Sequence, residues 1–348
     1  LKLWEALIPV VALIGMLAFN VYIYGDASLG GSNQFVLLLG GAVAAIMGYF
    51  NKVSFHKMLD EVANNIKSTA GAILILLMVG ALAGTWMVSG IIPSMIYYGL
   101  QILSPAIFLP ATLIICSVIS IATGSSWTTS ATVGIALIGI GGALGFDLGM
   151  VAGAVISGAY FGDKLSPMSD TTNLAPAMAG TDLFTHIKYM TLTTIPTYII
   201  TLILFIILGL SIEVKGDVNT NELLKAITTS FNVSGWLFLV PVIVIGLIVK
   251  KTEPLVALLV GTLLAGIFAV IFQPQIINQI AGVETMDFKS AYKGVMDAIT
   301  SKVVVPTENK TLADLFTSGG MAKMLPTIWL ILCAMVFGGI MDAIGALA

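Results

Sequence analysis

Residues 68–90, STAGAILILLMVGALAGTWMVSG, decide the fold class, because they are uncharged and longer than the roughly 20 apolar residues that cross a bilayer. They begin a run of 79 residues, 68–146, that contains no Lys, Arg, Asp, Glu or His. Further uncharged runs cover 189–212, 226–249, 254–283 and 324–341. The sequence therefore predicts an all-α, polytopic integral membrane protein.

The composition argues against several other classes. Hydrophobic residues make up 58% of the 348 positions and charged residues only 9%, against about 25% in soluble domains. All 15 basic residues are Lys, so nucleic-acid binding is not expected. Cys116 and Cys333 lie in apolar runs and are expected to be packing residues. Because no GxSxG, P-loop, HExxH or CxxC pattern occurs, neither an enzyme of these kinds nor a resident cofactor is expected.

Eight apolar segments are expected to be membrane helices, near 4–24, 34–50, 70–90, 106–122, 186–211, 233–249, 254–272 and 326–345. Two shorter, Gly-rich apolar pieces, 132–146 and 148–162, lie between the fourth and the fifth. At about 1.5 Å per residue, neither piece spans a hydrocarbon core of about 30 Å. They are therefore expected to form a broken helix or a re-entrant hairpin.

Three short segments of the first half recur in the same order in the second half. LIPV at 7–10 resembles LVPV at 239–242, and LLLGGAVAAI at 37–46 resembles LLVGTLLAGI at 258–267. ALAGTWMVSGII at 81–92 more faintly resembles VFGGIMDAIGAL at 336–347. Chance likeness between apolar segments is the alternative explanation. The recurrence predicts two repeats, which begin near residues 4 and 233.

Lysine placement predicts that the two repeats are inverted. Lys52, Lys57 and Lys67 follow the second expected helix, whereas Lys250 and Lys251 follow the first helix of the second repeat, and basic residues favour the cytoplasmic side. Inverted repeats are typical of secondary transporters. We expect a first repeat at 1–211, an external linker at 212–232, and an incomplete second repeat at 233–348. The polar segment 273–325 is expected at the surface, with an amphipathic helix at 288–299.

A segment rich in hydroxyl side chains, TGSSWTTSAT at 123–132, interrupts the longest uncharged run. Single Ser or Thr residues are common in helix packing within membranes. Seven in ten positions favour instead a loop or half-helix whose oxygens face a cavity. The residues predicted to contribute to a cation and proton site are Ser125, Ser126, Thr128 and Thr129.

A second polar segment, SGAYFGDKLSPMSDTTNLAPAMAGTD at 157–182, supplies carboxylates. Pro167 lacks the amide that would bond the carbonyl of Asp163, so the helix is expected to unwind there. Oxygen donors without thiolate or imidazole suit a hard cation such as Na⁺, and an ionisable residue at membrane depth is a functional candidate. The alternative is an aqueous loop. The predicted site residues are Asp163, Ser166, Asp170, Thr171, Thr172 and Asn173, with Na⁺ at Asp170 and Asp163.

Other ionisable residues are weaker candidates. His186 and Asp342 are considered as proton carriers, although a His at a helix end is more often structural. Asp182 is expected to cap the helix that contains His186. Asp147 is expected to be solvated in the turn between the two short apolar pieces.

The segment FGDKLSPMSDTTNLAP, with GSSWTTSATVG at 124–134 and AGTWMVSGIIP at 83–93, resembles the NhaC-type Na⁺/H⁺ antiporter family of bacteria. The resemblance covers most of the chain and implies a multi-pass protein of the cytoplasmic membrane that pairs a scaffold with a mobile transport domain. It also implies that Asp163, Ser166 and 170–173 form an acidic motif, and 125–128 a hydroxyl motif. Family members extend beyond residue 348.

The resemblance implies transport of Na⁺ and H⁺. Asp170 is expected to be buried in the unwound segment, where burial disfavours its bare charge, so a proton and Na⁺ would compete for this one carboxylate. The same family includes malate/lactate antiporters, so coupled exchange of a small carboxylate is the main alternative. A passive channel and an intramembrane aspartyl protease are remote alternatives, because neither a carbonyl filter such as TVGYG nor a complete GxGD pair is present. The sequence leaves the oligomeric state open, a homodimer included.

Overall fold

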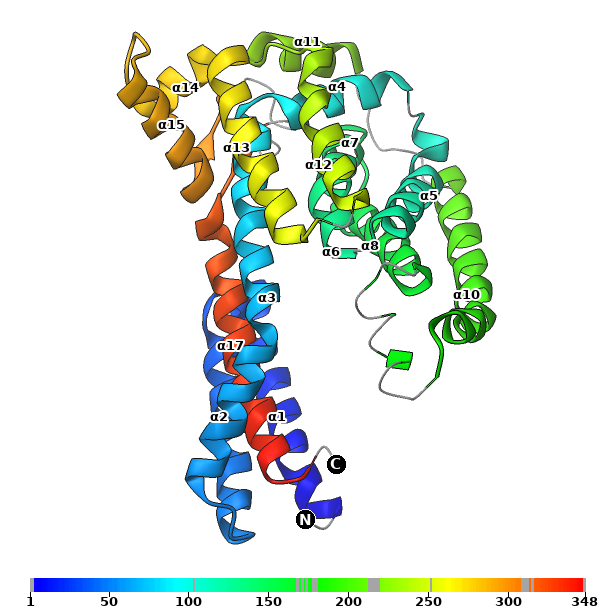
Figure 1. Ribbon diagram of the computed structural model, residues 1–348, viewed down its shortest axis with the longest axis vertical. Coiled ribbons are helices and arrows are strands. Elements are labelled where there is room, and N and C mark those ends of the chain that lie inside the picture. The colour runs from blue at the N-terminus through cyan, green and yellow to red at the C-terminus, as the bar shows by residue number, and fades with distance from the viewer. Residues whose placement is uncertain are drawn as a thin grey trace. The chain divides into compact units, whose positions relative to one another are not determined.

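The computed structural model describes residues 3–102, 104–124, 126–166, 169, 172, 175–176, 181–211, 220–250, 252–307, 313 and 316–346 (Figure 1). The described chain is helical apart from one antiparallel pair of very short strands, β1 (Val303–Val304) and β2 (Thr317–Ser318). Six of its helices are long and apolar enough to cross a membrane, or seven if a bent pair counts as one span. The predicted all-α, polytopic membrane fold is confirmed.

The chain divides into two compact units. The first contains residues 1–77 and 321–348, and the second contains residues 78–320. Helix α3 (Phe55–Val88) contributes its first part to one unit and its last part to the other. The predicted boundary near residue 233 concerns sequence repeats rather than compact units, and the repeats stay a prediction.

The first unit packs α1 (Leu3–Tyr24) and α17 (Leu325–Ala343) against α2 (Ser32–Phe50). Small residues of α2 allow close packing: a Cβ at Gly40 would lie 2.9 Å from Leu13 Cδ1 and 3.4 Å from Phe337 Cδ2. The first part of α3 packs on α17, since a Cβ at Gly339 would meet the backbone of Val62 at 2.6 Å. The α1–α2 turn (η1, Gly25–Gly30) is held by Asn20 Nδ2, which donates to Asn33 Oδ1 at 2.7 Å.

The second unit holds the remaining helices: α4 (Ile91–Ile102), α5 (Pro105–Thr123), α6 (Ser126–Thr129), the π-helical turn η2 (Ser130–Gly134), α7 (Ile135–Ala143), α8 (Leu148–Leu165), α10 (Leu183–Ser211), α11 (Thr220–Ser230), η3 (Gly235–Phe238), α12 (Leu239–Val249), α13 (Pro254–Phe272), α14 (Pro274–Ala281) and α15 (Phe288–Thr300). Helix α15 confirms the amphipathic helix expected at 288–299, and Asp287 caps it by accepting from Ser290 N at 2.7 Å.

Helices α12 and α13 repeat the packing of α1 and α2. A Cβ at Gly261 of α13 would lie 2.6 Å from Val244 Cγ2 of α12 and 2.9 Å from Leu82 Cδ1 of α3. In the sequence comparison above, Gly261 is the counterpart of Gly40, and Leu82 is the counterpart of Phe337. The matched small residue therefore contacts the matched large residue in each unit, which supports the predicted repeat.

Several boundaries differ from the sequence expectation; the helix expected at 233–249, for example, is the turn η3 followed by α12, which begins only at Leu239. Helix α3 begins at Phe55 rather than near residue 70, because the polar stretch that follows Ser54 continues the helix. Helix α8 extends to Leu165, three residues past the expected end at Gly162. The short helices α4, α11 and α14 were not among the expected segments.

Candidate functional site

Two short helices form the hairpin that carries the site. Helix α7 ends at Ala143, Gly145 turns the chain with φ of 84°, and α8 begins at Leu148. Asp147 is exposed in this turn and caps α8 by accepting from Met150 N at 3.1 Å. The two apolar pieces thus form two helices joined by a turn in which Asp147 is exposed, as expected, while re-entry of this hairpin into the membrane stays a prediction.

Helix α8 lies very close to α5 because it presents two glycines to that helix. A Cβ at Gly158 would collide with Leu113 O, and a Cβ at Gly162 would meet Ile121 N at 2.6 Å and Ser117 O at 2.7 Å. The spacing Gly158-x-x-x-Gly162 places both glycines on one face, where the absence of side chains lets two backbones approach. This contact positions the end of α8 beside the end of α5.

Asp163 is the carboxylate at this junction. Its side chain is partly buried, and its Oδ2 accepts a hydrogen bond from Ser126 Oγ at 2.9 Å. Ser126 begins α6 after the chain has turned at Gly124, whose φ of 68° lies in the left-handed region. The hydroxyl segment and the acidic segment, which the sequence only suggested separately, therefore meet at a direct contact.

The helix breaks directly after Asp163. Helix α8 ends at Leu165, and Ser166 is extended with ψ of 125°, as expected for the residue before a proline. Ser166 is buried, and its Oγ donates to Ile121 O at 2.8 Å. This hydrogen bond holds the residue at the helix break against the end of α5.

The carbonyl of Asp163 was expected to be free. Instead it accepts from Thr172 Oγ1 at 2.9 Å, and the same hydroxyl lies 3.2 Å from Lys164 O. Thr172 is buried, so this hydroxyl supplies the proton that an amide at position 167 would have given. Thr172 thus closes the broken helix, and the second lone pair of the carbonyl is what a cation would use.

Ser169, which was not among the predicted site residues, is buried near the break, and its Oγ accepts from Thr172 N at 3.4 Å. Thr129 is buried in α6, next to the π-helical turn η2, a kind of turn that often marks functional sites. Thr128 belongs to α6, but its side chain lies outside the described residues, as do Ser125, Asp170, Thr171 and Asn173.

The two proposed proton carriers lie in different units. His186 is partly buried in the first turn of α10, in the second unit, while Asp342 is exposed near the end of α17, in the first unit. Asp182 caps α10 as predicted, since it accepts from Phe184 N at 2.9 Å and Thr185 N at 3.2 Å. Hydrogen bonds from the Thr185 side chain and the Phe184 backbone hold the pKa of Asp182 below its ordinary value. Its capping contribution is therefore lost only as pH falls through that lowered pKa.

The junction offers oxygen ligands. The described residues contain no group of three or more His, Cys, Asp and Glu side chains that could hold a metal ion. The Asp163 carboxylate, the Ser126 hydroxyl and nearby carbonyls form a small set of hard donors, which suits an alkali cation.

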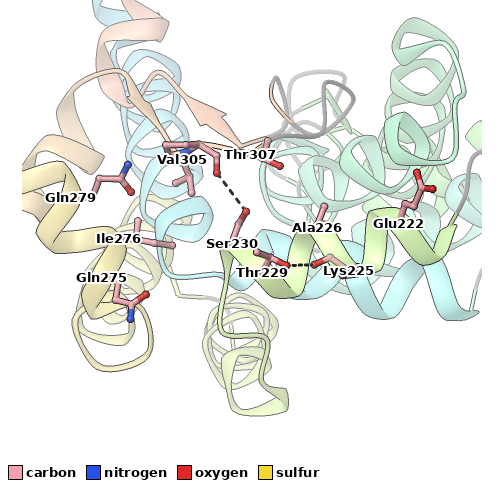
Figure 2. A pocket seen from close by; sticks show the side chains of 11 residues that line it. Glu222, Lys225, Ala226, Thr229, Ser230, Gln275, Ile276, Gln279, Val305 and Thr307 are labelled. Atoms are coloured by element: carbon pink, nitrogen blue, oxygen red, sulfur yellow. Dashed lines mark hydrogen bonds between the residues drawn. The ribbon is translucent and has the colours of Figure 1, made fainter.

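Two polar clefts lie elsewhere in the second unit. The larger, of about 810 Å³, lies between α11, which carries Lys225 and Ser230, and α14, which carries Gln275 and Gln279 (Figure 2). Ser230 Oγ donates to Pro306 O at 3.5 Å across it. None of the predicted ion-site residues that the structure describes lines this cleft. The smaller, of about 270 Å³, lies between α8 and α10 and includes Lys164, next to Asp163.

A multi-pass helical membrane protein that joins a carboxylate and hydroxyls at a broken helix has the architecture of a secondary transporter. Residues 158–348 match the Na⁺/H⁺ antiporter family, and the chain belongs to that family.

Three relatives are similar over most of this chain. The malate-2H⁺/Na⁺-lactate antiporter of Bacillus subtilis is 39% identical over 317 residues, covering 90% of this chain and 64% of that protein. The Na⁺/H⁺ antiporter NhaC of Alkalihalophilus pseudofirmus is 35% identical over 308 residues, covering 88% and 63%. The arginine/ornithine antiporter ArcD of Halobacterium salinarum is 32% identical over 350 aligned positions, covering 99% and 68%. This chain spans less than two thirds of the first two relatives. No solved structure matches it.

Proposed function

We propose that the protein exchanges Na⁺ for H⁺ across the bacterial cytoplasmic membrane. The observation that carries the proposal is the contact between Asp163 Oδ2 and Ser126 Oγ at the end of a broken helix. An ionisable side chain at such a position is expensive in a membrane and therefore a functional candidate. Because the chain spans only part of its relatives, the activity is proposed for a protein of the relatives' full length that contains this chain, called the longer protein below.

Competition between the two cations supplies the coupling. A proton and Na⁺ exclude one another at a single carboxylate, because the protonated group no longer offers the charge that binds Na⁺. The Asp163 carboxylate and the Ser126 hydroxyl oxygen would both be ligands of Na⁺, with further oxygens from the acidic motif that includes Asp170. Movement of the part that carries this site would then exchange one cation for the other, with His186 and Asp342 as further proton carriers to test.

The second candidate function is exchange of a small carboxylate coupled to Na⁺ and H⁺. The malate-2H⁺/Na⁺-lactate antiporter of Bacillus subtilis supports it, since its identity to this chain is 39%. The arginine/ornithine antiporter, at 32% identity, indicates that the organic substrate differs among relatives. Membership of the family therefore does not decide between the two candidate functions.

One experiment separates the two functions. Vesicles containing the longer protein receive an outward Na⁺ gradient, and internal pH is followed with a fluorescent dye, with and without lactate or malate. Acidification that needs only Na⁺ would support simple Na⁺/H⁺ exchange, and acidification that requires the acid would support the coupled function. No acidification under either condition would contradict the proposed function.

The predicted inversion of the repeats can be tested by labelling. Leu29 and Lys250 are both exposed, and we expect a cysteine at each to react with an impermeant maleimide from opposite sides of the membrane. The background replaces Cys116 and Cys333, which are buried. Labelling of both cysteines from one side would contradict the inverted orientation.

A further inference from the structure

The smaller cleft lies next to the cation site. Its walls come from the last part of α8 and the middle of α10 (Leu183–Ser211). Thr197 is 14 residues into this helix of 29, so it lies about 21 Å along a length of about 43 Å. Transporters bind their substrates near this depth, at the middle of the membrane.

The α8 wall of the cleft carries hydrogen-bond donors. Ser157, Tyr160 and Lys164 share one helix face by their spacing of three and four residues. Within the part of the chain that the structure describes, none of these three side chains has a hydrogen-bond or ion-pair partner. Among the described residues that line the cleft, Lys164 is the one charged side chain, so this lining favours an anion.

The α10 wall carries threonine hydroxyl groups that donate their protons to backbone carbonyls of the same helix. Thr197 Oγ1 donates to Thr193 O at 2.7 Å, and Thr201 Oγ1 donates to Thr197 O at 2.9 Å. Such bonds along one helix satisfy the hydroxyl proton and leave oxygen lone pairs as acceptors. The rings of Phe161 and Tyr198 stack between the two helices with centroids 3.9 Å apart, which adds an apolar surface.

Donors with a positive charge on one wall and acceptors on the other match a 2-hydroxy acid. Its carboxylate would bind Lys164 and the Tyr160 hydroxyl, and its own hydroxyl would donate to the α10 threonines. A volume of about 270 Å³ is small beside the 300–1,000 Å³ of sites for drug-sized ligands, so the acid has few carbons. A lysine that merely reached an interface would require neither the threonines nor the stacked rings.

We propose that the cleft between α8 and α10 binds a small hydroxycarboxylate beside the cation site. This inference rests on the second candidate function, exchange coupled to a small carboxylate, and assigns the site of that organic substrate. Because Lys164 directly follows Asp163 in α8, the acid and Na⁺ would bind on different faces of the same helix end.

The test measures uptake of radiolabelled lactate by vesicles that contain the longer protein and carry an inward Na⁺ gradient. We expect Lys164→Gln to raise the half-saturating lactate concentration about tenfold or more, and Tyr160→Phe to raise it less. Propionate is lactate without its hydroxyl group. Competition by propionate therefore distinguishes binding of the carboxylate by the α8 wall from binding of the hydroxyl by the α10 wall. Thr197→Val should weaken competition by lactate but not by propionate, whereas Lys164→Gln should weaken both.

The matched control is Thr191→Val, because Thr191 Oγ1 donates to Lys188 O at 2.6 Å in the same helix but does not line the cleft. It should behave as wild type. Wild-type lactate affinity in Lys164→Gln, or a wild-type protein that moves Na⁺ and H⁺ but no carboxylate, would overturn this inference alone. A wild-type protein that moves neither Na⁺ nor H⁺ would contradict the proposed function. If Lys164→Gln does not fold, competition by lactate and by propionate in Thr197→Val still tests the inference, and unchanged competition by lactate there would contradict it.

Discussion

The longer protein with Asp163→Asn is expected to lose sodium-dependent proton exchange, down to the background of empty vesicles. Asparagine keeps the shape and can still accept from Ser126 Oγ, which lies 2.9 Å from Asp163 Oδ2. It carries neither the charge that binds Na⁺ nor the proton that is exchanged. The measurement is vesicle acidification driven by Na⁺, with membrane insertion checked by protease protection.

Two companion variants make this result specific. Ser126→Ala removes one oxygen ligand but leaves the carboxylate, so we expect the half-saturating Na⁺ concentration to rise about tenfold without loss of exchange. Asp147→Asn should be silent, because Asp147 only caps α8 in an exposed turn and asparagine is an equally good cap. Normal exchange by Asp163→Asn would contradict the assigned role.

Asp170 requires the same test, because the sequence argument gives it the same role. If Asp170→Asn alone abolishes exchange, the cation is bound by the later part of the acidic motif, and Asp163 only positions it. If both substitutions abolish exchange, the two carboxylates act as one site.

The sequence predicted most of the fold because bilayer spans carry a strong signal. Long uncharged segments such as those in α1 and α13 appear at nearly the expected residues, and the polar turn at Asp147 separated α7 from α8. The extension of α3 back to Phe55 was missed, since its first turns contain Lys, Asp and Glu and lack the apolar run that marks a span. The residues of these first turns form a helix, but they are not apolar, so they did not indicate a membrane span.

The candidate site was predicted in composition but not in contacts. Pro167 correctly indicated that the helix ends near Asp163, because a proline restricts the residue before it and removes an amide. That Thr172 returns to cap the freed carbonyl depends on the path of the chain after the break, which local sequence does not encode. The Gly158-x-x-x-Gly162 spacing was present in the sequence and would have indicated a close helix contact.

That close contact leads to the last expected result, which is loss of both stability and exchange in Gly162→Ala. The added Cβ would lie 2.5 Å from Ser120 Cβ, 2.6 Å from Ile121 N and 2.7 Å from Ser117 O. Two of these atoms belong to the α5 backbone and cannot rotate away, so α5 and α8 must separate. Such overpacking costs roughly 1–3 kcal/mol, which should lower the midpoint of thermal unfolding by roughly 2–10 °C.

Separation of these helices also moves the cation site. Ser126 follows α5 and Asp163 follows Gly162, so the hydrogen bond between them lengthens when the helices part. We therefore expect the half-saturating Na⁺ concentration to rise along with the loss of stability. Gly153→Ala is the matched control: it makes the same change in α8, but its Cβ would have Phe205 Cζ at 3.9 Å as its nearest neighbour. Alanine there should be neutral or slightly stabilising, because it favours helix by up to about 1 kcal/mol over glycine. Equal effects of the two substitutions would mean that helix α8 tolerates displacement from α5 and that the glycine contact does not position Asp163.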